Sequence, residues 1–224
     1  MILSTEKKFI FIHVPKAAGT SVHGALGHFD VFHKVRRAEP ATRRRHAVAN
    51  GLPEAAADFR QHTAVRTVIE VLGRAAYDAY YAFTFVRNPW DTAVSWFHYR
   101  LQNPQIDGHA EAAAAGTFDT YVHRALAGPE GRRRLEFQHR YVTDDNGALA
   151  VRFVGRHETL AADFAAVTAH LGVEPLPLDH FNQSSHAPWA SLYTRETFAI
   201  VGELVARDAA LFGYPADPAV YGIR

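Results

Sequence analysis

FIFIHVPKAAGTS, residues 9–21, decides the fold of this chain. Its first part, residues 9–14, is an apolar run that a proline ends, which is typical of a strand buried on both faces of a parallel sheet. Residues 15–19 form a loop, and Thr20 or Ser21 is placed to cap a helix that begins there. The stretch therefore predicts a strand, a loop and a helix in succession.

The same succession recurs along the chain. FTFVRNPWDTAVSWF, residues 83–97, contains most of a strand at 81–86 and then Asn88, an N-cap residue with a proline behind it. A third strand is predicted at 149–154, before an amphipathic helix at 160–171. Strands that alternate with helices pair in parallel through right-handed crossovers. We expect an α/β fold with a P-loop-like central parallel sheet and helices on both faces.

Three further helices are predicted from apolar periodicity. They span residues 63–72, 118–126 and 195–212, and the last is capped by Thr194 and stopped by Gly213. Residues 36–58 show no clear period and are expected to be mostly irregular.

Composition limits the classes of function. The chain has 224 residues, 48% of them hydrophobic, which suits one domain over residues 1–224. The net charge is +1, so the chain does not have the strong positive field that is typical of proteins that bind nucleic acid. The absence of Cys suits a reducing compartment, and no run of about 18 apolar residues could span a membrane. We expect a cytoplasmic protein without a membrane span.

The loop after the first strand has the chemistry of an anion site. A loop that enters a helix offers backbone N–H groups and the positive end of the helix dipole. Lys16 adds a mobile charge, Gly19 allows close approach, and Thr20 and Ser21 add hydroxyl donors. The GxxxxGK[ST] pattern of ATPases and kinases is absent, because the Lys precedes the Gly.

A second motif follows the strand at 81–86. Arg87 stands at the strand end and Ser95 lies two turns into the next helix, where both can reach one phosphate. A tie between Arg87 and a carboxylate is the alternative interpretation.

Together these segments resemble the sulfotransferase superfamily, nearest to the branch of the uronyl 2-O-sulfotransferases and their bacterial relatives. The resemblance rests on HVPKAAGTS, FVRNPWDTAVS, VGRHETLAADF, FNQSSH and DAALFGY. It implies a single sulfotransferase-like domain that uses 3′-phosphoadenosine 5′-phosphosulfate (PAPS) and releases the desulfated nucleotide (PAP). By match, the 5′-phosphosulfate is held by Lys16, Ala17, Ala18, Gly19, Thr20 and Ser21, and the 3′-phosphate by Arg87 and Ser95. The resemblance also implies a loop near Asn182–His186 that closes the nucleotide site.

Sulfuryl transfer needs in-line attack, stabilisation of the leaving phosphate and removal of a proton from the acceptor hydroxyl. Lys16 is placed for the leaving charge, and no carboxylate cluster suggests a metal. His62 is the first choice for the base, because it precedes the helix predicted from Thr63 and matches the position of a catalytic His in the family. His98 is the reserve. Trp90 is expected in the core rather than against adenine.

Two other functions remain open at this point. A nucleotide kinase would use ATP and Mg²⁺ on the same fold, and a binding module would recognise a nucleotide or glycan without turnover. The expected acceptor is a hydroxyl on a saccharide or small molecule. Arg43–Arg45 or Arg132–Arg134 could hold an anionic saccharide, although each run is typical of an ordinary solvated surface.

Overall fold

The computed structural model describes residues 1–174, 178 and 187–224. The chain divides into two compact units, each built from two separate stretches. Unit 1 is Met1–Val86 with Gln138–Phe181, and unit 2 is Arg87–Phe137 with Asn182–Arg224. A single domain over the whole chain stays a prediction.

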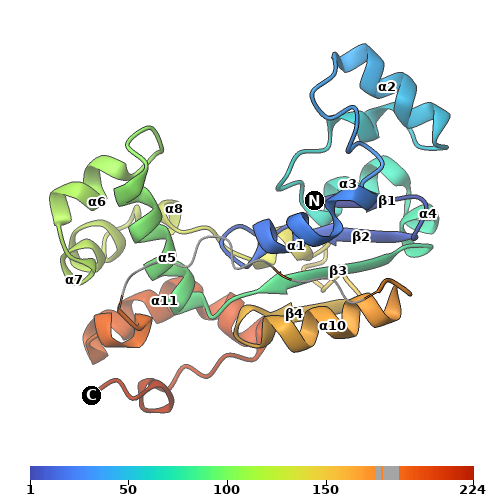
Figure 1. Ribbon diagram of the computed structural model, residues 1–224. Helices are drawn as coiled ribbons and strands as arrows, with labels where there is room; N and C mark the ends of the chain where they lie inside the picture. The colour runs from blue at the N-terminus through green and yellow to red at the C-terminus, as the bar shows by residue number, and fades with distance from the viewer. Residues whose placement is uncertain (175–177, 179–186) are drawn as a thin grey trace. The chain divides into compact units, whose positions relative to one another are not determined.

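Unit 1 is built on a four-stranded sheet in the order β1-β2-β3-β4 (Figure 1). The strands are β1 (Ile2–Ser4), β2 (Phe9–Ile12), β3 (Tyr81–Val86) and β4 (Phe153–Arg156). β2, β3 and β4 pair in parallel, whereas β1 pairs antiparallel with β2 and was not predicted. The α/β prediction is confirmed, and the third strand begins four residues later than its pattern suggested.

Aromatic side chains form one face of this sheet. Every residue of β2 is buried, as expected for a strand covered on both faces. The parallel register sets Phe11 beside Phe83, and their rings stack at 5.3 Å. Val22 and Leu26 of α1 (Gly19–Leu26) pack in the same core cluster as residues of α10 (Leu160–His170).

The remaining helices of unit 1 are α2 (Pro40–Ala49), α3 (Val65–Leu72), α4 (Arg74–Asp78) and α9 (His139–Val142). The expectation of irregular chain at 36–58 is wrong where α2 forms. That helix lacks an apolar stripe, with only Ala47 buried, and it begins at a proline in the first helical position.

Unit 2 is helical. Its helices are α5 (Pro89–Gln102), α6 (His109–Ala115), α7 (Phe118–Tyr121), α8 (Gly131–Arg134) and α11 (Arg195–Phe212). A π-helical turn, Val122–Leu126, continues α7. α11 packs on α5, where Trp90 stacks on Phe198 at 4.4 Å and donates its indole N–H to the Phe198 carbonyl at 2.9 Å. Trp90 is therefore a core residue, as predicted.

Candidate functional site

The loop between β2 and α1 carries backbone strain. Lys16 and Ala18 both have a φ of 64°, in the left-handed region that side chains disfavour. Lys8 is the third such non-glycine residue in the described part of the chain. Strain of this kind costs of order 1–3 kcal/mol per residue and clusters at functional sites. Two of the three residues, Lys16 and Ala18, lie in the loop that the sequence predicts to bind an anion.

The first turn of α1 faces this loop without a side-chain cap. The N-cap residue is Ala18, so the prediction that Thr20 or Ser21 caps the helix is wrong. Gly19 is already helical, which places both hydroxyls inside the first turn. Neither the Thr20 nor the Ser21 hydroxyl has a hydrogen-bond partner among the described residues. The N–H groups and hydroxyls of this turn are therefore available to an anion.

The need for glycine at position 19 comes from the space that neighbouring atoms occupy, and not from its backbone dihedral angles. Its φ is not positive, so the backbone alone would accept any residue. A Cβ at this position would lie 1.7 Å from Nε2 of His13. The buried His13 ring thus lies directly against the loop, a contact that the sequence did not predict.

His62 lies beside the same ring. Its Nδ1 donates to the His13 carbonyl at 2.9 Å, and the two ring centroids are 4.5 Å apart. α3 begins at Val65, later than predicted, because Thr63 folds into a turn in which its hydroxyl accepts from the Arg60 N–H at 2.7 Å. His62 is therefore held by its contact with residue 13 and not by the first turn of a helix.

In unit 2, Arg87 lies two residues before α5 and Ser95 lies within that helix. Arg87 forms a bidentate ion pair with Asp91, with its Nε 2.7 Å from Oδ2 and its Nη2 2.8 Å from Oδ1. The sequence allowed an ion pair between Arg87 and a carboxylate as the alternative to phosphate binding, and this ion pair is present. Ser95 is buried one turn beyond Asp91, on the same side of the helix. Thr92 is also buried, and its Oγ1 has no hydrogen-bond partner in the described chain.

The other candidates are less informative. His98 is half-buried on α5, with its ring 5.2 Å from that of Phe97. The segment Asn182–His186 lies outside the described residues.

A model of the sulfotransferase family matches residues 1–215 of the chain. The chain belongs to the sulfotransferase family. The match includes both loops described above. No curated protein and no solved structure gave a match.

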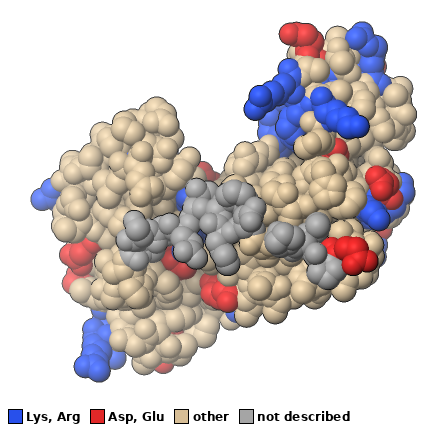
Figure 2. Space-filling model, in the orientation of Figure 1, with Lys and Arg blue, Asp and Glu red and all other residues tan. Residues whose placement is uncertain are grey.

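Arginine clusters of this sulfotransferase are largely engaged by its own residues. Figure 2 shows Lys and Arg side chains gathered over the part of unit 1 that carries α2. In that helix Arg43 donates to two backbone carbonyls, and Arg44 lies 3.6 Å from Asp58. These contacts favour an ordinary surface over a saccharide site.

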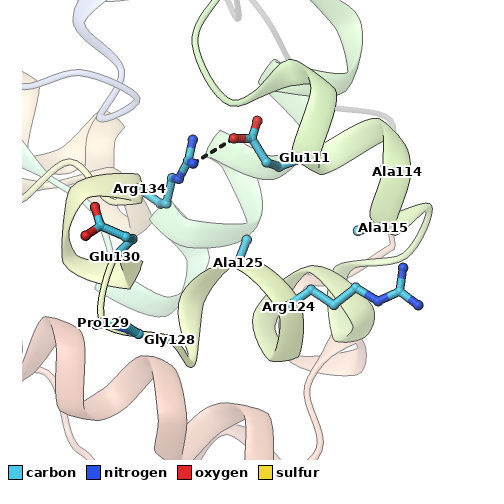
Figure 3. Close-up of a pocket in the computed structure, with 9 residues that line it drawn as sticks. All are labelled: Glu111, Ala114, Ala115, Arg124, Ala125, Gly128, Pro129, Glu130 and Arg134. Atoms are coloured by element: carbon cyan, nitrogen blue, oxygen red, sulfur yellow. Dashed lines mark ion pairs between the residues drawn. The ribbon is translucent and has the colours of Figure 1, made fainter.

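Unit 2 of the sulfotransferase contains a cavity of about 370 Å³ (Figure 3). Arg134 lines it and pairs with Glu111 at 2.7 Å, while Arg133 pairs with Glu130 at 3.0 Å. Arg124 and Glu130 also line it, and the rest of its wall consists of alanines at 114, 115 and 125 and residues 128–129, a Gly-Pro pair.

Two general features concern cofactors and membranes. Among the described residues, no group of three or more His, Asp or Glu side chains is arranged to hold a metal ion. None of the helices described has both the length and the apolar character needed to cross a membrane.

Proposed function

We propose that this sulfotransferase moves a sulfuryl group from PAPS to an acceptor hydroxyl. The observation that carries the proposal is the strained, uncapped loop at Lys16–Ser21. Backbone strain, N–H groups without a side-chain cap and a lysine coincide there, and each favours a phosphate or sulfate group. Membership of the sulfotransferase family supports the same chemistry.

The nucleotide would be held at both ends. Lys16, the N–H groups of residues 17–19 and the hydroxyls of Thr20 and Ser21 would bind the 5′-phosphosulfate. Arg87 and Ser95 would bind the 3′-phosphate. The parallel register of β2 and β3 supports this division, because both strands run toward one edge of the sheet, and the two motifs follow their carboxyl ends.

The reaction would be a single in-line displacement. The acceptor oxygen forms a bond to sulfur while the bond from sulfur to the bridging phosphate oxygen breaks, and PAP leaves. Lys16 would stabilise the negative charge that develops on the departing phosphate. His62 would accept the proton of the acceptor hydroxyl.

The tautomer of His62 supports its role as base. A carbonyl can only accept, so Nδ1 must carry the proton in its bond to the His13 carbonyl. In the neutral ring, Nε2 is then the nitrogen that can take up a proton. This supports His62 as the base.

The acceptor is proposed to be a saccharide or a small molecule with a free hydroxyl. The resemblance to the uronyl 2-O-sulfotransferase branch favours a sugar. The engaged state of Arg43, Arg44 and Arg134 favours an acceptor that does not depend on a broad basic surface. A bacterial origin and a cytoplasmic location stay expectations from the sequence.

Calorimetric titration with PAP, in the absence of metal, tests the proposal. We expect micromolar binding to the unmodified protein and loss of binding in Arg87→Ala. ATP with Mg²⁺ is the comparison ligand, because a kinase would bind it in preference. Binding of ATP with Mg²⁺ but not of PAP would overturn the proposal in favour of the kinase. PAP binding without transfer to any acceptor would favour the binding module.

A further inference from the structure

His13 is the residue on which two parts of the proposed site meet. His13 is 3% exposed, and its ring is in contact with Gly19, at the start of α1. Its backbone carbonyl accepts from Nδ1 of His62, 49 residues further along the chain. One residue therefore contacts both the loop proposed to bind the nucleotide and the side chain proposed as base.

The orientation of the His13 ring follows from its hydrogen bonding. Nε2 of Gln61 lies 3.4 Å from Nδ1 of His13. An amide nitrogen is a donor, so Nδ1 accepts and Nε2 carries the proton of the neutral ring. Nε2 is the atom nearest to the missing side chain of Gly19, at 1.7 Å from where a Cβ would stand.

The ring is kept neutral and rigid. Burial, the N-terminal ammonium group and the neighbouring His62 and His23 together lower the pKa of His13 to about 2. Its ring lies 5.7 Å from Phe11 and 5.4 Å from His23, in addition to its contact with His62. A side chain packed on several sides and bonded at one nitrogen has a single orientation, as positioning requires.

We propose that His13 is a positioning residue for the transfer reaction, whose ring sets the place of the phosphate loop at Gly19 and whose carbonyl sets the tautomer of His62. The inference rests on the proposed function, because it assumes that the loop binds the nucleotide. It explains the glycine by the space that the His13 ring occupies. His13 itself need not touch substrate.

The proposal that the His13 ring sets the place of the loop at Gly19 is tested by enlarging residue 19 and shrinking residue 13. PAP affinity would be measured by calorimetry for Gly19→Ala, for His13→Ala and for the double variant. We expect Gly19→Ala to weaken binding at least about tenfold, because the methyl group and the ring cannot both fit. The double variant should bind within about threefold of His13→Ala, since removal of the ring makes room for the methyl group.

Gly27→Ala is the matched control. Gly27 follows the last residue of α1, and a Cβ there would lie 3.6 Å from Nδ1 of His23, an ordinary contact. This variant should bind PAP as the unmodified protein does. Thermal unfolding of all variants shows whether each is folded. A double variant that binds as weakly as Gly19→Ala would overturn the inference, because the methyl group would then block the nucleotide itself.

Nitrogen NMR of histidine-labelled protein tests the second half without any ligand. We expect the His62 ring to carry its proton on Nδ1, and the opposite tautomer would contradict the inference. Failure of the unmodified protein to bind PAP would instead contradict the proposed function. The two failures are therefore distinguishable.

Discussion

Asp91 holds the guanidinium of Arg87 through two parallel hydrogen bonds of 2.7 and 2.8 Å. The pair is nearly enclosed, with side-chain exposures of 11% for Arg87 and 8% for Asp91. A guanidinium held in this way has a fixed direction. The carboxylate tie is thus compatible with phosphate binding, since Asp91 can orient Arg87 for that task.

Asp91→Asn should weaken both folding and PAP binding. Loss of one partner from a buried pair costs about 3 kcal/mol or more, because the remaining charge is left uncompensated. We expect a fall of this order in the free energy of unfolding, measured with urea. The dissociation constant for PAP should rise at least about tenfold.

Asp78→Asn is the control for that variant. Arg74 and Asp78 form an ion pair at the same spacing, with 2.9 Å between Nε and Oδ2, but on an exposed surface. Little change in stability or PAP binding is expected there. Equal effects of the two substitutions would show that the burial and orientation of the Arg87–Asp91 pair contribute neither to stability nor to PAP binding.

Ala18→Gly should stabilise the protein. The left-handed conformation of Ala18 costs about 1 kcal/mol, which glycine avoids. Ala17→Gly is the matched control, because Ala17 does not have a positive φ and glycine there only raises the entropy of the unfolded chain. The free energy of unfolding should therefore rise for position 18 and fall for position 17. The same sign at both positions would contradict the strain described for this loop.

His62→Gln should separate binding from transfer. We expect PAP affinity to be unchanged within about threefold and transfer from radiolabelled PAPS to fall by about 10²- to 10⁴-fold. The assay would use a panel of saccharides and hydroxyl-bearing small molecules. His98→Gln serves as the comparison and should retain activity. Loss of transfer in His98→Gln alone would identify the reserve residue as the base.

His13 should make the protein sensitive to acid. Its pKa is lowered by burial from 6.5 to about 2, so the unfolded chain takes up a proton near pH 6.5 that the folded chain refuses. The stability due to this group is complete above that pH and falls by about 1.4 kcal/mol per pH unit below it. Urea midpoints between about pH 4 and pH 7 should show a smaller decline for His13→Gln than for the unmodified protein. A matching substitution of the exposed His33 should leave the decline unchanged.

Local signals in the sequence were sufficient for several elements. α11 begins and ends as predicted, because Thr194 forms a capping box with Thr197 and Gly213 adopts a left-handed conformation. Asn88 accepts from the N–H of Trp90 at 3.0 Å, as its place before a proline indicates. In these cases the determining contacts lie within a few residues of one another.

Elements that depend on distant contacts could not be predicted. β1 has three residues, too few to show a period, and exists because it pairs with β2. The role of Gly19 depends on the ring of His13, just after β2, and the orientation of His62 depends on a carbonyl 49 residues away. The sequence therefore predicted which residues are candidates for the chemistry, but not the contacts that hold them in place.

The division of the chain into two units also determines the effect of cleaving its backbone. Each unit consists of two stretches, so a cut at any single peptide bond leaves at least one unit incomplete. Proteolysis after residue 181 would leave every segment of unit 1 but remove α11, whose Phe198 covers Trp90. The bare indole would lie at the first turn of the helix that follows Arg87. A C-terminal nick should thus first disturb the segment that we propose binds the 3′-phosphate.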